Sequence, residues 1–158
     1  MKIGVLSDTH LNQITQEFVD IYNTHLSDVD MIIHAGDIVS LNIIDFLEKN
    51  VFHGVQGNMD PLEIKARLPE KKIVEVGCHR LGIIHGWGAA RGLEDRIFPL
   101  FPNGRCPGLI CSALSGLDQK GINSVAKQIV GEVRTKPQFS GYFSSLSMNF
   151  GFRINFRD

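Results

Sequence analysis

The chain has 158 residues, 43 % of them hydrophobic, and a formal net charge of −1. This length fits one domain with a sizeable buried core, and the near-neutral charge argues against nucleic acid as a main partner. No run approaches the roughly 20 apolar residues of a membrane span, and residues 1–8 lack the pattern of a signal peptide, so we expect a cytoplasmic protein without membrane contact. Three cysteines support neither a disulfide framework nor a zinc ribbon.

Three short apolar runs in the first sixty residues predict strands at 2–7, 31–35 and 51–56. Apolar residues recur at helical spacing between them, so the order is strand, helix, strand, helix, strand. Such an order predicts an α/β fold with a largely parallel sheet flanked by helices. Ligands of such sheets sit outside the carboxyl ends of the strands, where all three runs stop at an acid or an amide.

Polar residues mark the expected helix starts. Asn12 or Thr15 is available as the cap of the first helix and Ser40 as the cap of the second.

Two further apolar runs, at 72–76 and 81–84, predict a β-hairpin that delivers the next residue to the same end of the fold.

The remainder of the chain has weaker patterns. A helix is predicted at 91–98, before a proline, and a second one from apolar spacing at 122–130. Residues 146–156 alternate between apolar and polar or glycine, which is typical of a half-buried strand.

Hard oxygen and nitrogen donors stand at the ends of the first runs. Asp8 and His10 are two apart, so in an extended segment both would project from one face and hold one cation. Asp37 follows a buried run and a glycine, and its two oxygens can bridge two cations about 3.5 to 4 Å apart. Asn58 offers an amide oxygen and His85 an imidazole. Each residue alone has an ordinary structural explanation, but the combination at strand ends predicts a two-metal site.

Four motifs carry a family resemblance: Ser7-Asp8-Thr9-His10, Ile33-His34-Ala35-Gly36-Asp37, Val55-Gln56-Gly57-Asn58-Met59-Asp60 and Ile83-Ile84-His85-Gly86. In this order they closely resemble the calcineurin-like metallophosphoesterase superfamily, and specifically its small prokaryotic phosphodiesterase branch. The similarity covers about residues 1–103. It implies a layered fold of sheets flanked by helices, with the second sheet incomplete or altered by the tail that follows.

The resemblance also implies a chemistry. Asp8 and His10 would hold one ion, Asn58 and His85 the other, and Asp37 would bridge them. A hydroxide held between the metals would attack phosphorus in line, so the expected activity is hydrolysis of a small phosphate ester, more specifically a phosphodiester. Manganese is the first choice of metal, and Ni, Fe, Zn and Mg remain compatible because the ligand set contains no sulfur.

Three departures from the family pattern bear on activity. The Gly-His-x-His motif, which supplies a further imidazole to each metal, is missing, and no histidine follows His85. Met59 stands where many relatives have a histidine, and Trp87 stands where relatives often have another. We therefore expect weakened metal binding and low turnover, with Asp37, Asn58 and Asp60 as the catalytic candidates.

The composition changes at about residue 103. Residues 1–103 hold 9 Lys and Arg against 14 Asp and Glu, whereas residues 104–158 hold 7 against 3. We divide the chain there into a metallophosphoesterase-like region and an atypical tail, either packed in the same domain or partly disordered. A frameshift near codon 103 or 104 would explain the change, and translation of the coding DNA in the other two frames tests that hypothesis.

Two other readings of the sequence compete with the hydrolase. One is a binding or scaffold protein that keeps the fold without turnover. The other is a Rossmann-type nucleotide-binding domain, which fails because residues 7–10 hold no Gly-x-Gly-x-x-Gly turn after the first strand. Self-association of the chain stays open.

Overall fold

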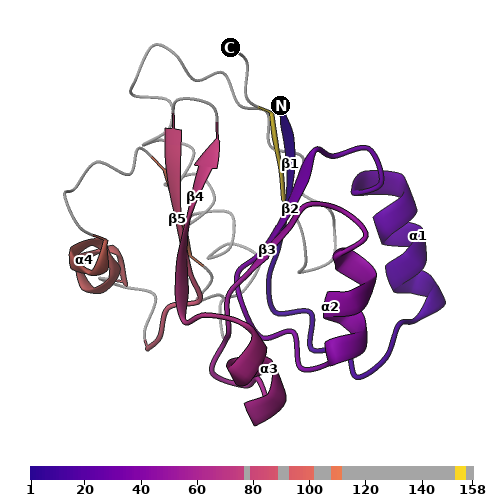
Figure 1. Ribbon diagram of the computed structural model, residues 1–158, viewed down its shortest axis with the longest axis horizontal. Helices are drawn as coiled ribbons and strands as arrows, with labels where there is room; N and C mark the ends of the chain where they lie inside the picture. The colour runs from indigo at the N-terminus through magenta and orange to yellow at the C-terminus, as the bar shows by residue number, and fades with distance from the viewer. Residues whose placement is uncertain (77–78, 89–92, 102–107, 112–151, 156–158) are drawn as a thin grey trace.

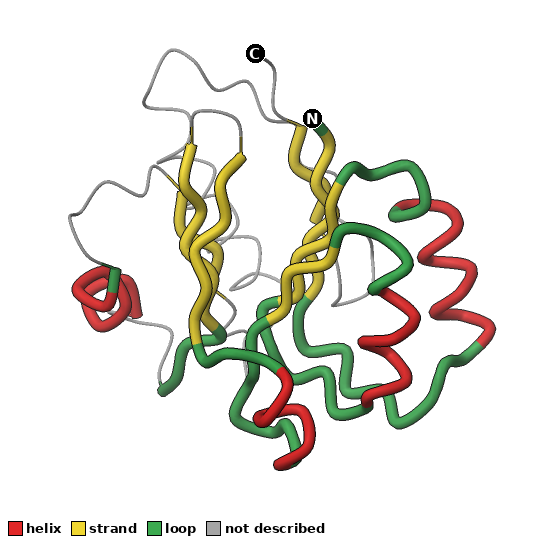
Figure 2. Tube along the Cα trace, in the orientation of Figure 1, coloured by secondary structure: helices red, strands yellow, loops and turns green. Residues whose placement is uncertain are grey.

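Two β-sheets lie face to face, with helices on their outer sides (Figures 1 and 2). This computed structural model describes residues 1–76, 79–88, 93–101, 108–111 and 152–155. The expected helix at 122–130 and residues 146–151 and 156 of the expected last strand lie outside the described residues. The α/β fold predicted from the strand and helix order is confirmed, and so are the layered sheets that the family resemblance implied.

The first sheet has the strand order β3-β2-β1-β7. Its strands are β1 (Lys2–Leu6), β2 (Met31–His34), β3 (Phe52–Gly54) and β7 (Phe152–Asn155). β1 pairs in parallel with β2, and β2 in parallel with β3, as the βαβαβ order predicts. β7 adds antiparallel to β1, with Ile3 opposite Ile154, so a strand from the tail occupies the edge beyond β1.

The second sheet has the order β4-β5-β6. β4 (Lys71–Val76) and β5 (His79–Ile84) pair antiparallel, which confirms the predicted hairpin. β6 (Gly108–Cys111), a strand that the sequence analysis did not predict, pairs in parallel with β5. The end of β5 brings His85 to the edge of the first sheet at which β1, β2 and β3 end.

Four α-helices are described: α1 (Gln16–His25), α2 (Leu41–Leu47), α3 (Leu62–Arg67) and α4 (Leu93–Ile97). α1 and α2 cover the outer side of the first sheet, and α4, which continues into a 3-10 turn at Phe98–Leu100, covers the outer side of the second (Figure 1). α3 was not predicted, because six residues after a proline give too short a periodic pattern. None of the described helices combines the length and apolar character needed to cross a bilayer.

Thr15, and not Asn12, is the cap of α1. Its side chain accepts a hydrogen bond from the Phe18 N–H at 3.2 Å, which satisfies one of the free donors in the first turn. Replacing Thr15 with alanine is expected to lower the free energy of unfolding by about 1 kcal/mol. Urea unfolding monitored by circular dichroism measures this loss, and Thr15→Ser, which keeps the hydroxyl, should retain most of the stability. Equal losses for both variants would contradict a capping role.

Three clusters of buried apolar side chains hold the layers together. The first fills the space between the two sheets: Ile3, Val5, Met31, Ile33, Ala35, Val55, Val74, Val76, Leu81 and Ile83. The second joins the first sheet to its helices and includes Phe18, Ile43, Ile44 and Leu47, and the third joins Ile84 to Leu93, Ile97 and Phe101.

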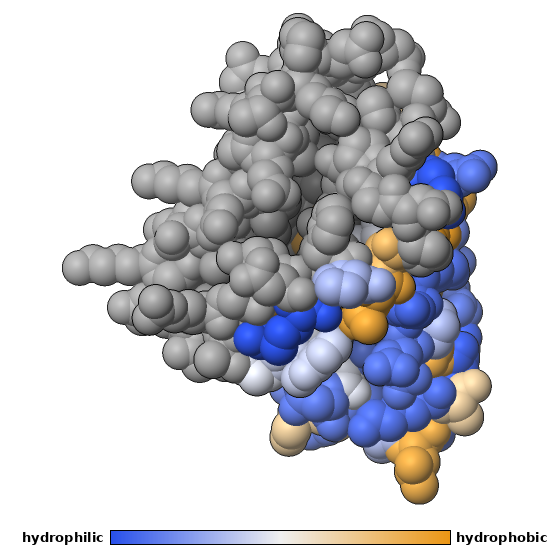
Figure 3. Space-filling view, turned by 90° about the vertical axis from the view of Figure 1, so that its left-hand side faces the viewer, coloured by the Kyte–Doolittle hydropathy of each residue, from blue (hydrophilic) through white to orange (hydrophobic). Residues whose placement is uncertain are grey.

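On the face shown in Figure 3, the described surface is mainly hydrophilic, with apolar residues at separate points.

Candidate metal centre

The site forms where β1 and β2 end side by side. The Asp8 N–H donates to the Gly36 carbonyl at 3.0 Å, and the His10 N–H donates to the Asp37 carbonyl at 3.2 Å. These bonds continue the pairing of β1 and β2 beyond the last ladder residues, so the loop after β1 is held against the loop after β2. The side chains of both loops therefore meet at one edge of the sheet, as the strand order predicts.

The backbone of these loops is left-handed and not extended. Asp8, His10 and Asp37 have φ angles of 52°, 47° and 58°. The expectation that Asp8 and His10 share one face of an extended segment is therefore wrong, although the two side chains do meet. Positive φ is rare for residues with a side chain, and such strain concentrates at functional sites.

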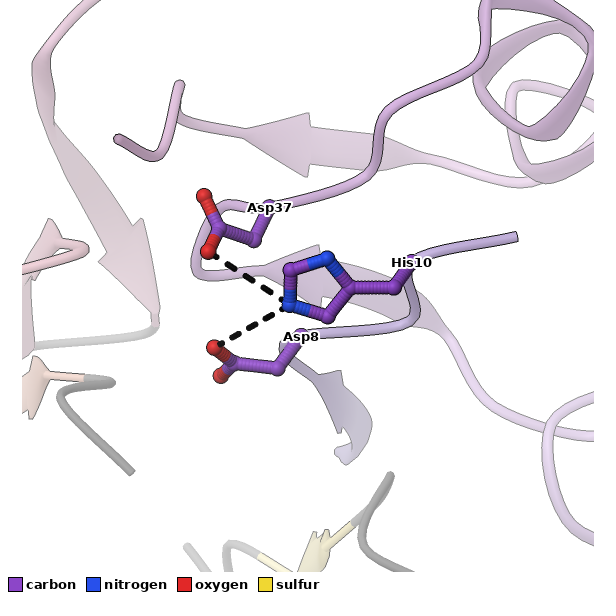
Figure 4. A group of neighbouring side chains, drawn as sticks. All are labelled: Asp8, His10 and Asp37. Atoms are coloured by element: carbon purple, nitrogen blue, oxygen red, sulfur yellow. Dashed lines mark ion pairs between the residues drawn. The ribbon is translucent and has the colours of Figure 1, made fainter. Parts of the chain in front are cut away.

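The Asp37 carboxylate lies at the middle of the site, and its side chain is fully buried. Its Oδ1 accepts a hydrogen bond from the Met59 N–H at 2.8 Å. Its Oδ2 lies 3.5 Å from His10 Nε2 and 3.5 Å from His85 Nε2. His10 Nε2 is also 3.9 Å from Asp8 Oδ1, so Asp8 and Asp37 approach the same imidazole nitrogen (Figure 4).

His85 has a fixed orientation. Its Nδ1 lies 2.9 Å from the Ala35 carbonyl oxygen, which can only accept, so Nδ1 carries the proton. In the neutral ring Nε2 is then an acceptor, and it lies 2.9 Å from Asn58 Oδ1, which is a second acceptor. The Asn58 amide can turn its NH₂ group toward Nε2 and donate to it, or keep Oδ1 there when a cation lies between the two residues. A carbonyl that fixes the far nitrogen is also the usual partner of a metal-ligating histidine.

Two glycines leave the space in which Asp37 sits. A Cβ atom at Gly57 would lie 2.1 Å from Asp37 Oδ1 and 2.3 Å from Asp37 N. A Cβ atom at Gly36, where φ is +102°, would lie 2.8 Å from the His85 ring. Both positions therefore require glycine, for close approach at Gly57 and for backbone conformation as well at Gly36.

The donor set fits divalent cations. Within the part of the chain that the structure describes, Asp37 Oδ2 is buried and accepts no hydrogen bond, although burying an unsatisfied carboxylate oxygen is costly. Asp8, His10 and Asp37 each offer a ligand atom, and these atoms lie within 4.8 Å of one another. Two ligand atoms bound at about 2.1 Å, at angles between a right angle and a tetrahedral one, are about 3 to 3.5 Å apart. The two distances from Asp37 Oδ2, to His10 Nε2 and to His85 Nε2, fall in this range at 3.5 Å, and the 2.9 Å between His85 Nε2 and Asn58 Oδ1 lies just below it.

A buried histidine that the sequence analysis did not select supports the same loops. His34 is fully buried at the end of β2, its Nδ1 accepts from the Gly36 N–H at 3.2 Å, and its Nε2 lies 3.2 Å from Thr9 Oγ1. Burial, and to a smaller extent the charges of His85 and His10, lowers the pKa of His34 to about 3. The ring is therefore neutral and donates from Nε2 to Thr9. The sequence signal was a histidine that ends an otherwise apolar strand.

The remaining motif residues have different surroundings. Asp60, expected as a catalytic candidate, is buried, and its two oxygens accept hydrogen bonds from backbone N–H groups. Met59 and Trp87, the two positions where the family often has histidine, are 62 % and 47 % exposed. Asn58 is exposed beside His85. The five predicted metal ligands thus lie together, and Asp60 lies behind them.

Comparison with known proteins identifies the family. The calcineurin-like phosphoesterase superfamily domain matches residues 1–104. The chain belongs to the calcineurin-like phosphoesterase superfamily. The resemblance drawn from the four motifs is thus confirmed.

Two curated relatives are similar to this chain. A probable metallophosphoesterase of Methanocaldococcus jannaschii is 41 % identical over 87 residues, which are 54 % of this chain and 43 % of the relative. A probable metallophosphoesterase of Methanothermobacter thermautotrophicus is 38 % identical over 93 residues, which are 58 % of this chain and 54 % of the relative. The chain therefore spans about half the length of the curated relatives it matches.

Solved structures share the superfamily fold. A Thermotoga maritima protein is 30 % identical, with a TM-score of 0.53 and coverage of 70 % of this chain and 71 % of the other. An archaeal phosphodiesterase is 25 % identical, with a TM-score of 0.53 and coverage of 70 % and 72 %. Vps29 of Entamoeba histolytica is 23 % identical, with a TM-score of 0.55 and coverage of 75 % and 67 %, and this likeness concerns the fold alone.

Proposed function

We propose that this chain is a metal-dependent phosphoesterase and that its substrates are phosphodiesters. The observation that carries the proposal is the surroundings of Asp37 Oδ2. This buried carboxylate oxygen faces imidazole nitrogens of His10 and His85, each at 3.5 Å, and it accepts no hydrogen bond from the described residues. An oxygen in this position suits a ligand shared between two cations.

The proposed roles follow from position. Asp8 and His10 hold one ion, Asn58 and His85 hold the other, and Asp37 contributes to both. When bound, divalent cations lower the pKa of water and neutralise charge that develops on phosphoryl oxygens. Manganese is our first choice among the metals that oxygen and nitrogen donors accept.

The exposure of the ligands gives the direction from which a substrate arrives. The side chain of His10 is 43 % exposed, and Asn58 is exposed as well, whereas the side chains of Asp37 and His85 are 0 % and 5 % exposed. A phosphate ester therefore reaches the site over His10 and Asn58. Asp37 and His85 form its floor, where the low dielectric strengthens their interaction with charge.

The leaving group has to depart without help from position 59. The Met59 side chain has no proton to donate, and the Met59 N–H is already bonded to Asp37 Oδ1. Esters of acidic alcohols, which leave as stable anions, are therefore the most suitable substrates. This chemistry favours nitrophenyl esters as the first assay.

The test is metal-dependent hydrolysis of bis-p-nitrophenyl phosphate. The purified chain is stripped with EDTA, and release of nitrophenol is followed as Mn²⁺ is added. We expect activity only with added metal, and faster release from the diester than from p-nitrophenyl phosphate. A folded protein that binds Mn²⁺ and releases nitrophenol from neither ester would overturn the proposed activity.

A binding or scaffold function is the second candidate, because the ligand set is small. The described residues give each proposed ion three side-chain donors, with Asp37 counted for both, and the chain has no histidine after His85. Three protein ligands suffice at many catalytic sites. Binding of Mn²⁺ without hydrolysis in the same assay would favour this second function.

A further inference from the structure

We propose that Asp60 is a positioning residue that locks the loops after β2 and β3 into the conformation that presents Asp37 to the metal centre. The metal-dependent part of this inference rests on the proposed function. The mechanical part, in which one carboxylate clamps two loops, concerns the chain by itself.

The contacts of Asp60 join the two loops. Its Oδ2 accepts hydrogen bonds from the Gly57 N–H at 2.7 Å and the Asp37 N–H at 3.2 Å. Its Oδ1 accepts from the Val39 N–H at 2.8 Å. Asp60 is only 3 % exposed, and hydrogen bonds to a carboxylate are about twice as strong as those between neutral groups. Three backbone donors from two loops therefore converge on one buried charge.

Two of these donors belong to strained residues. Asp37 and Val39 have φ angles of 58° and 64°, in the left-handed region that favours glycine. For a β-branched residue such as Val39, this conformation is a true outlier, which persists only when the surroundings enforce it. The N–H groups of both residues point to the Asp60 carboxylate. We infer that these hydrogen bonds enforce the left-handed turn.

The turn decides where the Asp37 side chain points. With its backbone held by Asp60 and its Oδ1 held by the Met59 N–H, Asp37 directs Oδ2 toward His10 and His85. If Asp37 and Val39 relaxed to ordinary negative φ, Oδ2 would leave this position. Asp60 thus acts through Asp37, because its own oxygens are occupied by backbone donors.

The first test replaces Asp60 and measures Mn²⁺ affinity by calorimetry. Asp60→Ala removes both acceptor oxygens and with them all three hydrogen bonds. Asp60→Asn keeps one oxygen but turns an NH₂ group toward a backbone N–H. This variant is used for the same measurement if the alanine variant does not fold. We expect a loss of about 10 to 100-fold in affinity, which is typical of removing a group that orients a metal ligand. Asp45→Asn, at an exposed carboxylate paired with Arg67, is the matched control and should bind as the unchanged chain does.

The second test relieves the strain directly. Val39→Gly tolerates a positive φ without steric cost and keeps the N–H, so in the Asp60→Asn background it should recover a large part of the lost affinity. Val39→Ala in the same background also removes side-chain atoms but keeps a Cβ, and it should recover much less. Equal recovery by both, or no recovery, would contradict a clamp that works through the turn. Leu26→Val, in the buried cluster at the C-terminal cap of α1 and beside Gly4 of β1, controls for loss of stability alone.

Amide hydrogen exchange separates this inference from the proposed function. In EDTA, the amides of Asp37, Val39 and Gly57 should be protected in the unchanged chain and exchange at least tenfold faster in Asp60→Asn. If the unchanged chain binds no Mn²⁺ but shows this difference, the proposed function fails and the clamp stands. If exchange at these amides does not change, the clamp is wrong whatever the metal affinity.

Discussion

Replacing Asp37 with asparagine is expected to reduce the affinity for Mn²⁺ by more than about 100-fold. Loss of a residue that only orients a metal ligand usually costs about 10 to 100-fold, and loss of the ligand itself should cost more. Asparagine has nearly the same shape, and its oxygen can still accept the hydrogen bond from the Met59 N–H. Its NH₂ group would replace Oδ2 and face His10 and His85, and a donor cannot bind a cation. Metal-dependent hydrolysis should fall with the affinity.

The same substitution should not destabilise the metal-free protein. Oδ2 is buried without a donor among the described residues, whereas an NH₂ group there can donate to an imidazole nitrogen. We therefore expect the Tm of Asp37→Asn in EDTA to equal or exceed that of the unchanged chain. A site that gives up stability for ligand binding behaves in this way.

Thermal denaturation with and without Mn²⁺ measures both effects at once. A ligand at 100 times its Kd stabilises the folded state by about 2.7 kcal/mol, so saturating Mn²⁺ should raise the Tm of the unchanged chain and leave that of Asp37→Asn unchanged. Asp45→Asn should respond to Mn²⁺ as the unchanged chain does. A large fall in Tm for Asp37→Asn in EDTA would show instead that Asp37 has a purely structural role.

The position of the site could be predicted from the sequence because it depends on strand order. Short apolar runs that stop at Asp8, Asp37 and Asn58 give parallel strands whose carboxyl ends meet, and the hairpin brings in His85. Hydrophobic periodicity and topology rules suffice for this inference. The side-chain contacts among Asp37, His85 and Asn58 show that the residues meet as expected.

The backbone conformation of the loops could not be predicted in the same way. Nothing in the sequence indicates that Val39, a residue that prefers strands, has a φ of 64°. The three backbone bonds to Asp60 depend on the folded path of two loops that are 20 residues apart, so the sequence could only indicate an acid near the site. Backbone donors are the same in every non-proline residue, and for that reason a clamp of this kind has no sequence pattern.

A fall in stability on mild acidification is the second large effect we expect, and it comes from His34. The pKa of His34 is lowered from 6.5 to about 3, by burial first and then by the charges of His85 and His10. Above pH 6.5 the ring is neutral in both the folded and the unfolded chain, so the full stability is present. Between pH 6.5 and about 3 the unfolded chain binds a proton that the folded chain does not. The free energy of unfolding should therefore fall by up to about 1.4 kcal/mol for each pH unit below 6.5.

Urea unfolding at pH 7, 6 and 5 in EDTA tests this expectation. His34→Asn removes the titrating ring and keeps an acceptor for the Gly36 N–H, so it should be less stable at pH 7 but lose less stability on acidification. His25→Asn, at the end of α1, is the matched control and should keep the pH dependence of the unchanged chain. His53, whose pKa burial also lowers, is present in all three proteins and contributes equally to each. Parallel pH profiles for His34→Asn and the unchanged chain would mean that the buried ring does not control acid stability.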